Sequence, residues 1–131
     1  HLSIRRQRQM CIRDRLECNV TGEASKYGYA VSGWEDDADL LAALRAEAVA
    51  VSSLPGLRLE GLMTVAPITN DCAVMRRAFA SLRGLRDCLQ AELPEASLSH
   101  LSMGMTDDFE AAILEGATIV RIGRAIFGAR N

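Results

Sequence analysis

Short apolar segments alternate with segments of helical periodicity along most of this chain. Four segments are typical of strands, at residues 16–20, 59–66, 98–102 and 118–122. Between them, apolar residues recur at steps of three and four, which places them on one face of a helix; in the first such segment they are Leu40, Leu44, Ala48 and Val51. Strands and helices in alternation predict parallel strands joined by crossover helices, which is an α/β fold.

Helix boundaries can be predicted from acidic residues, glycines and prolines. Residues 35–37, 70–71 and 106–108 supply acidic or capping side chains at the three expected helix starts. Pro55 with Gly56 ends the first helix, Pro94 follows the second, and the third ends before Gly116. A short apolar stretch at 125–127 follows the last expected strand.

The length of the chain limits which α/β architecture it can form. Its 131 residues, 49% of them hydrophobic and 24% charged, suit one soluble globular domain. A closed eight-stranded α/β barrel needs about 250 residues and rarely fewer than about 200. A barrel-like pattern in this chain would therefore belong to a fragment of a barrel.

Residues 1–15, HLSIRRQRQMCIRDR, differ from the rest of the chain. They hold five of the fourteen arginines and show no alternation. One interpretation is a basic arm that binds nucleic acid or an anionic surface, in which case deleting it abolishes binding. The phrase RQRQMCIRDR also resembles the translation of sequencing-adapter read-through. We expect residues 1–15 to be a non-native leader and residues 16–131 to form the domain.

Composition argues against several classes of function. A net charge of -2 does not favour a nucleic-acid groove, and the four cysteines, at 11, 18, 72 and 88, form no C-x-x-C pair. With histidines only at 1 and 100, we expect no metal site and reduced thiols. No apolar run approaches the roughly 20 residues of a membrane span, and no secretory signal is evident, so we expect a cytoplasmic protein without a membrane partner.

Two of the loops that follow expected strands can bind phosphate. In parallel sheets, ligands gather beyond the carboxyl ends of the strands. Residues 102–106 (SMGMT) lead directly into a helix, and their glycine lets the backbone approach an anion closely. Gly123 and Arg124 offer the same access beside a positive charge. The pair of loops is a stronger indication of a phosphate site than either loop alone.

Arg121 lies inside the apolar strand at 118–122, and two interpretations of it remain open. It could form a structural ion pair with a carboxylate such as Glu60 or Glu115. Alternatively, it could face the ligand and donate a hydrogen bond to an atom that must stay unprotonated, because arginine does not release its own proton.

Four segments in the same order resemble one known family. Residues 102–108 (SMGMTDD), 110–113 (EAAI) and 116–128 (GATIVRIGRAIFG) resemble the end of the pyridoxal phosphate homeostasis proteins, also called the alanine racemase N-terminal-like or proline synthetase co-transcribed family. Upstream, residues 61–67 (GLMTVAP) and 19–28 (NVTGEASKYG) resemble its earlier strands and loops. The resemblance covers residues 16–130 and implies the C-terminal half, strands five to eight, of a (β/α)8 TIM-type barrel that binds pyridoxal 5′-phosphate.

The resemblance also implies roles for individual residues. It places around the cofactor phosphate, chiefly through backbone amides, residues Ser102, Gly104, Met105, Gly123 and Arg124. It places Arg121 at the pyridine nitrogen, where a neutral ring is a weak electron sink and carriage is favoured over amino-acid chemistry. Position 124 departs from the small hydroxyl residue often found in the family.

The lysine that holds the cofactor in this family belongs to the first barrel strand, which would lie upstream of residue 16. The one lysine here, Lys26, is in another loop, so we expect no covalent attachment. The resemblance implies a protein of intracellular cofactor homeostasis, without catalysis of its own, whose partners include pyridoxal phosphate and cofactor-dependent apo-enzymes. The isolated fragment should self-associate through its open sheet edges. The alternative is half of an alanine-racemase-type or other phosphate-binding barrel enzyme.

Overall fold

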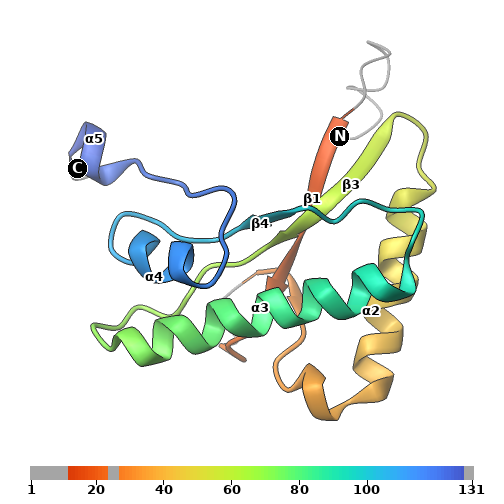
Figure 1. Cartoon of the computed structure of the whole chain (residues 1–131), viewed down its shortest axis with the longest axis horizontal. Helices are drawn as coiled ribbons and strands as arrows, with labels where there is room; N and C mark the ends of the chain where they lie inside the picture. Colours follow the sequence, from red (N-terminus) through yellow and green to blue (C-terminus); the bar gives the residue numbers. More distant parts are fainter. Residues whose placement is uncertain (1–11, 24–26, 129–131) are drawn as a thin grey trace.

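A parallel four-stranded sheet organises the chain, in the order β2-β1-β3-β4. Figure 1 shows three of its strands, β1, β3 and β4. The computed structural model describes residues 12–23 and 27–128. The strands are β1 (Ile12–Asn19), β2 (Tyr29–Ala30), β3 (Leu57–Met63) and β4 (His100–Ser102). Each neighbouring pair is parallel, as the alternation of strand and helix patterns predicts.

Strand β1 begins upstream of the segment expected at 16–20. Ile12, Arg13 and Asp14 pair with residues 57–59 of β3. The register then shifts between Asp14 and Arg15, because Arg15 pairs with Gly61. Residues 12–15, which we expected to lie outside the domain, are therefore part of the sheet. Residues 1–11 of the expected leader and Lys26 lie outside the described residues.

The two long helices are capped by aspartates. In α2 (Ala38–Ser52), the side chain of Asp37 accepts a hydrogen bond from the backbone N–H of Leu40 at 3.0 Å. In α3 (Cys72–Glu92), Asp71 accepts one from the N–H of Ala73 at 2.9 Å. Each cap satisfies a donor that the first helical turn leaves free. A 3-10 turn, η1 (Trp34–Asp36), precedes α2.

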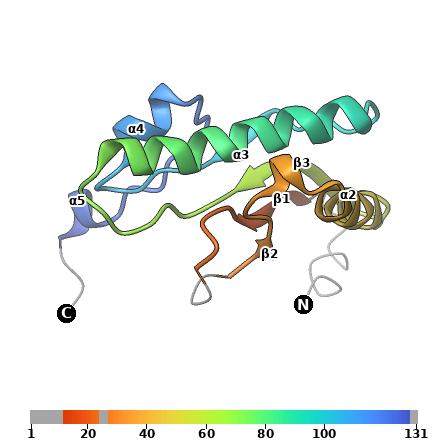
Figure 2. The same ribbon diagram turned by 90° about the horizontal axis from the view of Figure 1, so that it is seen from below.

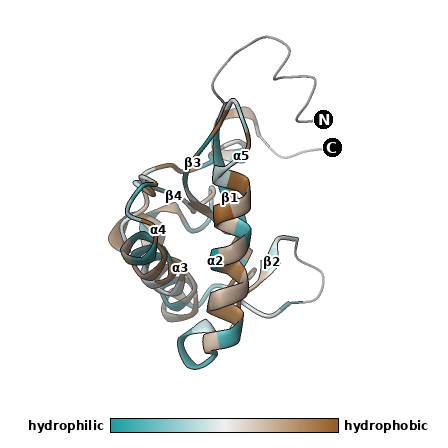
Figure 3. Ribbon diagram, turned by 90° about the vertical axis from the view of Figure 1, so that its right-hand side faces the viewer, coloured by the Kyte–Doolittle hydropathy of each residue, from teal (hydrophilic) through white to brown (hydrophobic). Residues whose placement is uncertain are grey.

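The core lies between the sheet and α3, which runs along one side of it (Figure 2). The helix buries residues spaced at three and four: Met75, Ala78, Phe79, Leu82, Leu85 and Leu89. They pack with buried Leu62 of β3 and Leu101 of β4. Figure 3 shows the apolar and polar residues alternating around α2, whose Leu44 and Ala48 are buried.

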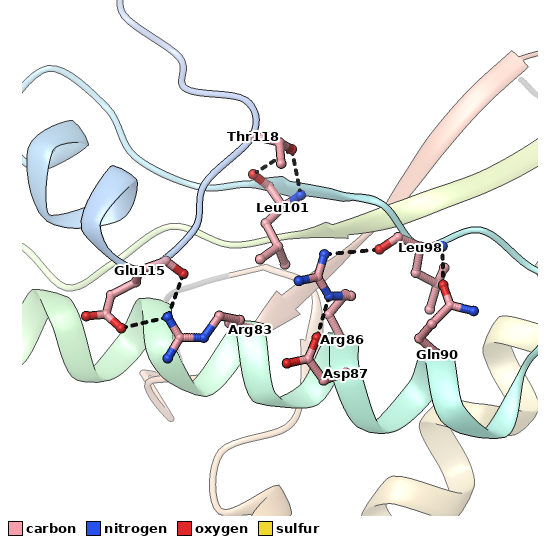
Figure 4. Close-up of polar contacts among 8 residues, drawn as sticks. All are labelled: Arg83, Arg86, Asp87, Gln90, Leu98, Leu101, Glu115 and Thr118. Carbon is pink, nitrogen blue, oxygen red and sulfur yellow. Dashed lines mark hydrogen bonds and ion pairs between the residues drawn. The ribbon is translucent and has the colours of Figure 1, made fainter.

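Polar side chains of α3 bind the segments that follow it (Figure 4). Arg83 Nη1 donates to the main-chain oxygen and to Oε1 of Glu115, both at 3.0 Å. Arg86 Nη1 donates to the oxygen of Leu98 at 3.2 Å, and Gln90 Oε1 accepts from the N–H of Leu98 at 2.6 Å. These bonds fix both ends of segment 98–115, which carries β4 and the first candidate loop at 102–106.

The expected strand at 118–122 is reduced to one bridge, between Ser102 and Ile119. The hydroxyl of Thr118 accepts the N–H of Leu101 at 2.9 Å and lies 3.1 Å from His100 Nδ1 (Figure 4 shows the contact with Leu101). The hydroxyl of Thr118 thus takes the place of a main-chain carbonyl as the acceptor for Leu101, and this interrupts the backbone hydrogen bonding expected of a strand at 118–122. Two short helices, α4 (Phe109–Leu114) and α5 (Arg124–Phe127), flank this segment.

Candidate functional site

Gly104 occupies a place in the first loop that a larger residue cannot share. Its φ of +105° lies in the left-handed region, and a Cβ there would stand 2.7 Å from the Cβ of Ala112 and 3.1 Å from the Cα of Phe109. The main-chain oxygen of Gly104 accepts a hydrogen bond from the N–H of Arg121 at 2.8 Å. The glycine therefore lets the loop lie against both α4 and the segment that carries Arg121.

Met105 follows with its amide already engaged. Its N–H donates to Oδ1 of Asp108 at 2.7 Å, while its oxygen accepts from the N–H of Phe109 at 2.9 Å. Its side chain is 44% exposed. One of the amides to which the family resemblance gives a role in phosphate binding thus has an internal carboxylate as its partner. From the sequence, Asp108 is predicted only to stand at the start of a helix.

The second loop presents free amides. Within the described residues, the backbone N–H groups of Gly123 and Arg124 donate no hydrogen bond. A Cβ at Gly123 would meet nothing within 4 Å, so the loop is not packed against other residues on that side. Backbone amides that lack an acceptor can bind an anion.

Two contacts bring the loops together. The N–H of Ala125 donates to the hydroxyl of Thr106 at 3.3 Å, and the guanidinium of Arg124 forms an ion pair with Asp107. Both side chains of this ion pair are more than half exposed. The structure thus joins residues 102–108 to residues 123–125, as the pairing of the loops in the sequence predicts.

Ser102 lies beneath this edge, at the end of β4. It is buried at 2% exposure, and its main-chain oxygen accepts from the N–H of Thr64 at 3.1 Å. Thr64 is fully buried, and its hydroxyl donates to the oxygen of Cys18 at 2.6 Å. Thr64 therefore ties β1, β3 and β4 together where their carboxyl ends meet. The sequence analysis does not predict a role for Thr64, although a hydroxyl group at the end of an apolar strand can indicate a residue that lines a site.

Arg121 reaches across the same edge. Its Nη2 donates to the main-chain oxygen of Thr64 at 2.9 Å, and its buried Nε has no hydrogen-bond partner among the described residues. Burial lowers the pKa of Arg121, while the carboxylates of Glu17 and Asp108 act in the opposite direction. A guanidinium anchored at one nitrogen and unpartnered at another can donate to a ligand that arrives at this edge.

Neither carboxylate considered for a structural ion pair binds Arg121. Glu60 Oε1 lies 3.3 Å from Arg13 Nε. Glu115 pairs with Arg76 at 2.7 Å and with Arg83 at 3.0 Å, and the hydrogen bond from Arg76 is the main cause of its lowered pKa. Neither of these two ion pairs forms among the described residues, because the side chain of Arg121 bonds to the main-chain oxygen of Thr64 instead.

A pocket of about 540 Å³ lies at the opposite end of the sheet. It is lined by the end of α2, the start of β3 at Leu57 and residues 92–97. None of the candidate site residues lines it. In residues 12–23 and 27–128, no group of three or more potential ligands is placed to hold a metal ion. Within the same ranges, no helix has the length and apolar character needed to cross a membrane.

The parallel sheet, crossover helices and glycine loops past the carboxyl edge define a protein of the parallel α/β class. Residues 28–131 match the family model described as alanine racemase, N-terminal domain, and the chain belongs to this family. The family resemblance in the sequence is thereby confirmed.

Several curated relatives share the name pyridoxal phosphate homeostasis protein. The chain is 52% identical over 116 residues to the one from Pseudomonas aeruginosa, an alignment that covers 88% of this chain and 44% of the relative. Identity to the one from Aquifex aeolicus is 42%, covering 88% of this chain and 46% of the relative. The chain thus spans less than half the length of these relatives.

Solved structures of PipY from Synechococcus elongatus have the same arrangement. With pyridoxal phosphate bound, PipY matches with a TM-score of 0.77 at 30% identity, over 96% of this chain and 53% of PipY. Without it, the TM-score is 0.80 at 31% identity, over 96% and 54%. These matches agree with a parallel α/β fold that accounts for about half of a longer relative.

Proposed function

We propose that this chain forms part of a pyridoxal 5′-phosphate carrier that acts in intracellular cofactor homeostasis. The observation that carries the proposal is the position of Arg121, which is anchored on the oxygen of Thr64 and keeps a buried, unpartnered Nε at the edge where two glycine loops meet. The name shared by the relatives and the pyridoxal phosphate bound in PipY support the choice of ligand.

The residues of the site fit the two ends of this ligand. The free amides of Gly123 and Arg124, the Gly104 backbone and Ser102 would hold the phosphate, as backbone donors do in other anion sites. Met105 would add its amide once Asp108 releases it. Arg121 would donate to the pyridine nitrogen and keep it unprotonated. Bound pyridoxal phosphate supplies an aldehyde and an electron-accepting ring, and an unprotonated ring accepts electrons weakly.

The architecture supports the view that these strands are the second half of a barrel. All described strands are parallel, and α3 covers one side of the sheet (Figure 2). The chain matches 44% to 46% of the curated relatives and 53% to 54% of PipY. Strands β1, β3 and β4, with the segment at 118–122, would then be strands five to eight of a TIM-type barrel.

A racemase-type function is the second candidate, and the name of the family model favours it. Racemisation needs two bases on opposite sides of the substrate. The hydroxyl of Tyr29 donates to Glu47 at 3.3 Å, and Tyr27 is 85% exposed. Neither tyrosine makes a hydrogen bond to Arg121 or to the two loops among the described residues. This arrangement favours a carrier over an enzyme.

Titration of the full chain with pyridoxal phosphate tests the proposal. We expect saturable binding that inorganic phosphate competes away, and no retained cofactor after borohydride reduction and denaturation. Pyridoxal, which lacks the phosphate, should bind much more weakly. Equal binding of pyridoxal and pyridoxal phosphate would contradict a phosphate site, and a borohydride-fixed adduct at Lys26 would contradict non-covalent carriage.

A further inference from the structure

Two consecutive aspartates face the positive groups of the candidate site. Asp107 pairs with the guanidinium of Arg124. Asp108 is half-buried, and its carboxylate acts to raise the pKa of Arg121, against the effect of burial. Both arginines of the site are therefore under the electrostatic influence of a carboxylate of the chain, with an ion pair at Arg124 and without one at Arg121.

Asp108 also occupies a backbone donor. Its Oδ1 accepts a hydrogen bond from the N–H of Met105 at 2.7 Å, at the short end of the range for such bonds. Because one amide hydrogen is directed to one acceptor here, a phosphate oxygen on Met105 would have to take the place of this carboxylate. A phosphate bound beside Asp108 would also be repelled by its charge.

We propose that Asp108 is an internal competitor for the phosphate group, so that ligand binding exchanges one anion for another at the Met105 amide. The inference rests on the proposed function and extends it to release of the ligand. A carrier must give up its cofactor, and a carboxylate that returns to the vacated amide stabilises the empty loop. Affinity is thereby kept lower than the donors of the loop alone would give.

A variant without the charge of Asp108 shows whether this residue competes with phosphate or only stabilises the loop. In Asp108→Asn, the side-chain oxygen can still accept from Met105, but the negative charge is gone. We expect pyridoxal phosphate and inorganic phosphate to bind about three- to tenfold more tightly than to the unchanged chain, because the repulsion between the phosphate and one partly screened carboxylate is removed. Affinity for pyridoxal should not change, because it carries no phosphate.

Glu110→Gln is the matched control. Glu110 is exposed in the first turn of α4, two residues from Asp108, and its replacement removes the same charge without touching Met105. We expect this variant to bind like the unchanged chain. An equal gain in both variants would overturn the proposal, because it would reflect only the general charge of the surface.

The amide resonance of Met105 gives a second readout, in nitrogen–proton correlation spectra recorded during phosphate addition. Exchange of anions predicts a large shift of this resonance in the unchanged chain. A Met105 resonance that stays in place while Gly123 and Arg124 shift would show that phosphate binds without displacing Asp108, and weaker binding by Asp108→Asn would show that Asp108 only supports the loop. Either result overturns the inference and leaves the proposed function intact. Failure of both proteins to bind phosphate overturns both.

Discussion

Arg121 and Thr64 are joined by a 2.9 Å hydrogen bond from Nη2 to a main-chain oxygen, although 57 residues separate them in sequence. The bond connects segment 118–122 to the end of β3. It lies at the carboxyl edge of the sheet, where ligands bind in parallel α/β proteins. It directs the guanidinium along this edge rather than toward a structural carboxylate. The chemistry proposed for the site depends on this orientation.

Replacement of Arg121 should show whether its side chain binds the pyridine ring or the phosphate group of the ligand. In Arg121→Gln, we expect affinity for pyridoxal phosphate to fall roughly tenfold, about 1.4 kcal/mol, because a hydrogen bond from a charged donor is lost. Affinity for inorganic phosphate should be unchanged, since the loop amides remain. Isothermal titration with both ligands checks this, and an equal loss for both would place Arg121 at the phosphate instead.

Gly123 offers a clean test of backbone access. Its φ is -117°, and a Cβ there meets nothing within 4 Å, so Gly123→Val should fold normally. A β-branched side chain beside the free amides should hinder the approach of phosphate, and we expect phosphate binding to be lost. Gly104→Val should lose both binding and stability, because its Cβ would contact Ala112 at 2.7 Å. Full phosphate binding by Gly123→Val would contradict the assigned loop.

Glu115 should make the fold sensitive to acid. Its pKa is lowered from the ordinary value of 4.5 by Arg76 and Arg83, so its ionised form stabilises the folded chain above that value. As the pH falls below about 4.5 and through the lower folded pKa, this contribution is lost. Glu115→Gln should lower the free energy of unfolding at pH 7 by about 1–2 kcal/mol and flatten its decline in acid. Urea denaturation across pH measures both effects, and an unchanged slope would count against the ion-pair network.

The apolar side chains of α5 should promote self-association. Ile126 and Phe127 are 70% and 85% exposed, and apolar side chains at an incompletely covered end favour contact between copies. We expect the unchanged chain to sediment as oligomers and Phe127→Glu to shift it toward monomer. Ile68→Glu is the matched control, because Ile68 is also fully exposed but lies after β3. A monomeric unchanged chain would contradict this prediction.

Truncation separates the leader from the sheet. We retain the proposal that the leader is non-native, and expect removal of residues 1–11 to leave stability and ligand binding unchanged. Removal of residues 1–15 should destabilise the fold, because Ile12, Arg13 and Asp14 pair with β3. Thermal unfolding of the two truncated chains measures the difference. Equal stability would mean that the first half of β1 contributes nothing.

The order of the longer strands and helices could be predicted from sequence because it depends on periodicity, whereas the two-residue strand β2 is too short to show a period. The face of α3 and the parallel sheet follow from the spacing of apolar residues. The extension of β1 to Ile12 could not, because residues 12–15 lack alternation and pair through their main chain. The short extent of pairing at 118–122 depends on the hydroxyl of Thr118, whose contact with Leu101 is a tertiary detail.

The positions of the two candidate loops were predictable to a similar degree. The two glycine loops could be found because glycine and helix-start residues are local features of the sequence. The partner of Arg121 could not, because a main-chain oxygen carries no side-chain identity to search for. The bond between Met105 and Asp108 also escaped prediction, since an aspartate at a helix start is usually explained by capping alone.

Amide mapping of the full chain with inorganic phosphate tests the central claim most directly. We expect the largest changes in amide chemical shift on phosphate addition at Gly104, Met105, Gly123 and Arg124. These changes should saturate as one site is filled. Sulfate should compete, and chloride at equal ionic strength should not reproduce the shifts. Shifts spread over the surface arginines, or confined to the pocket lined by residues 92–97, would contradict it.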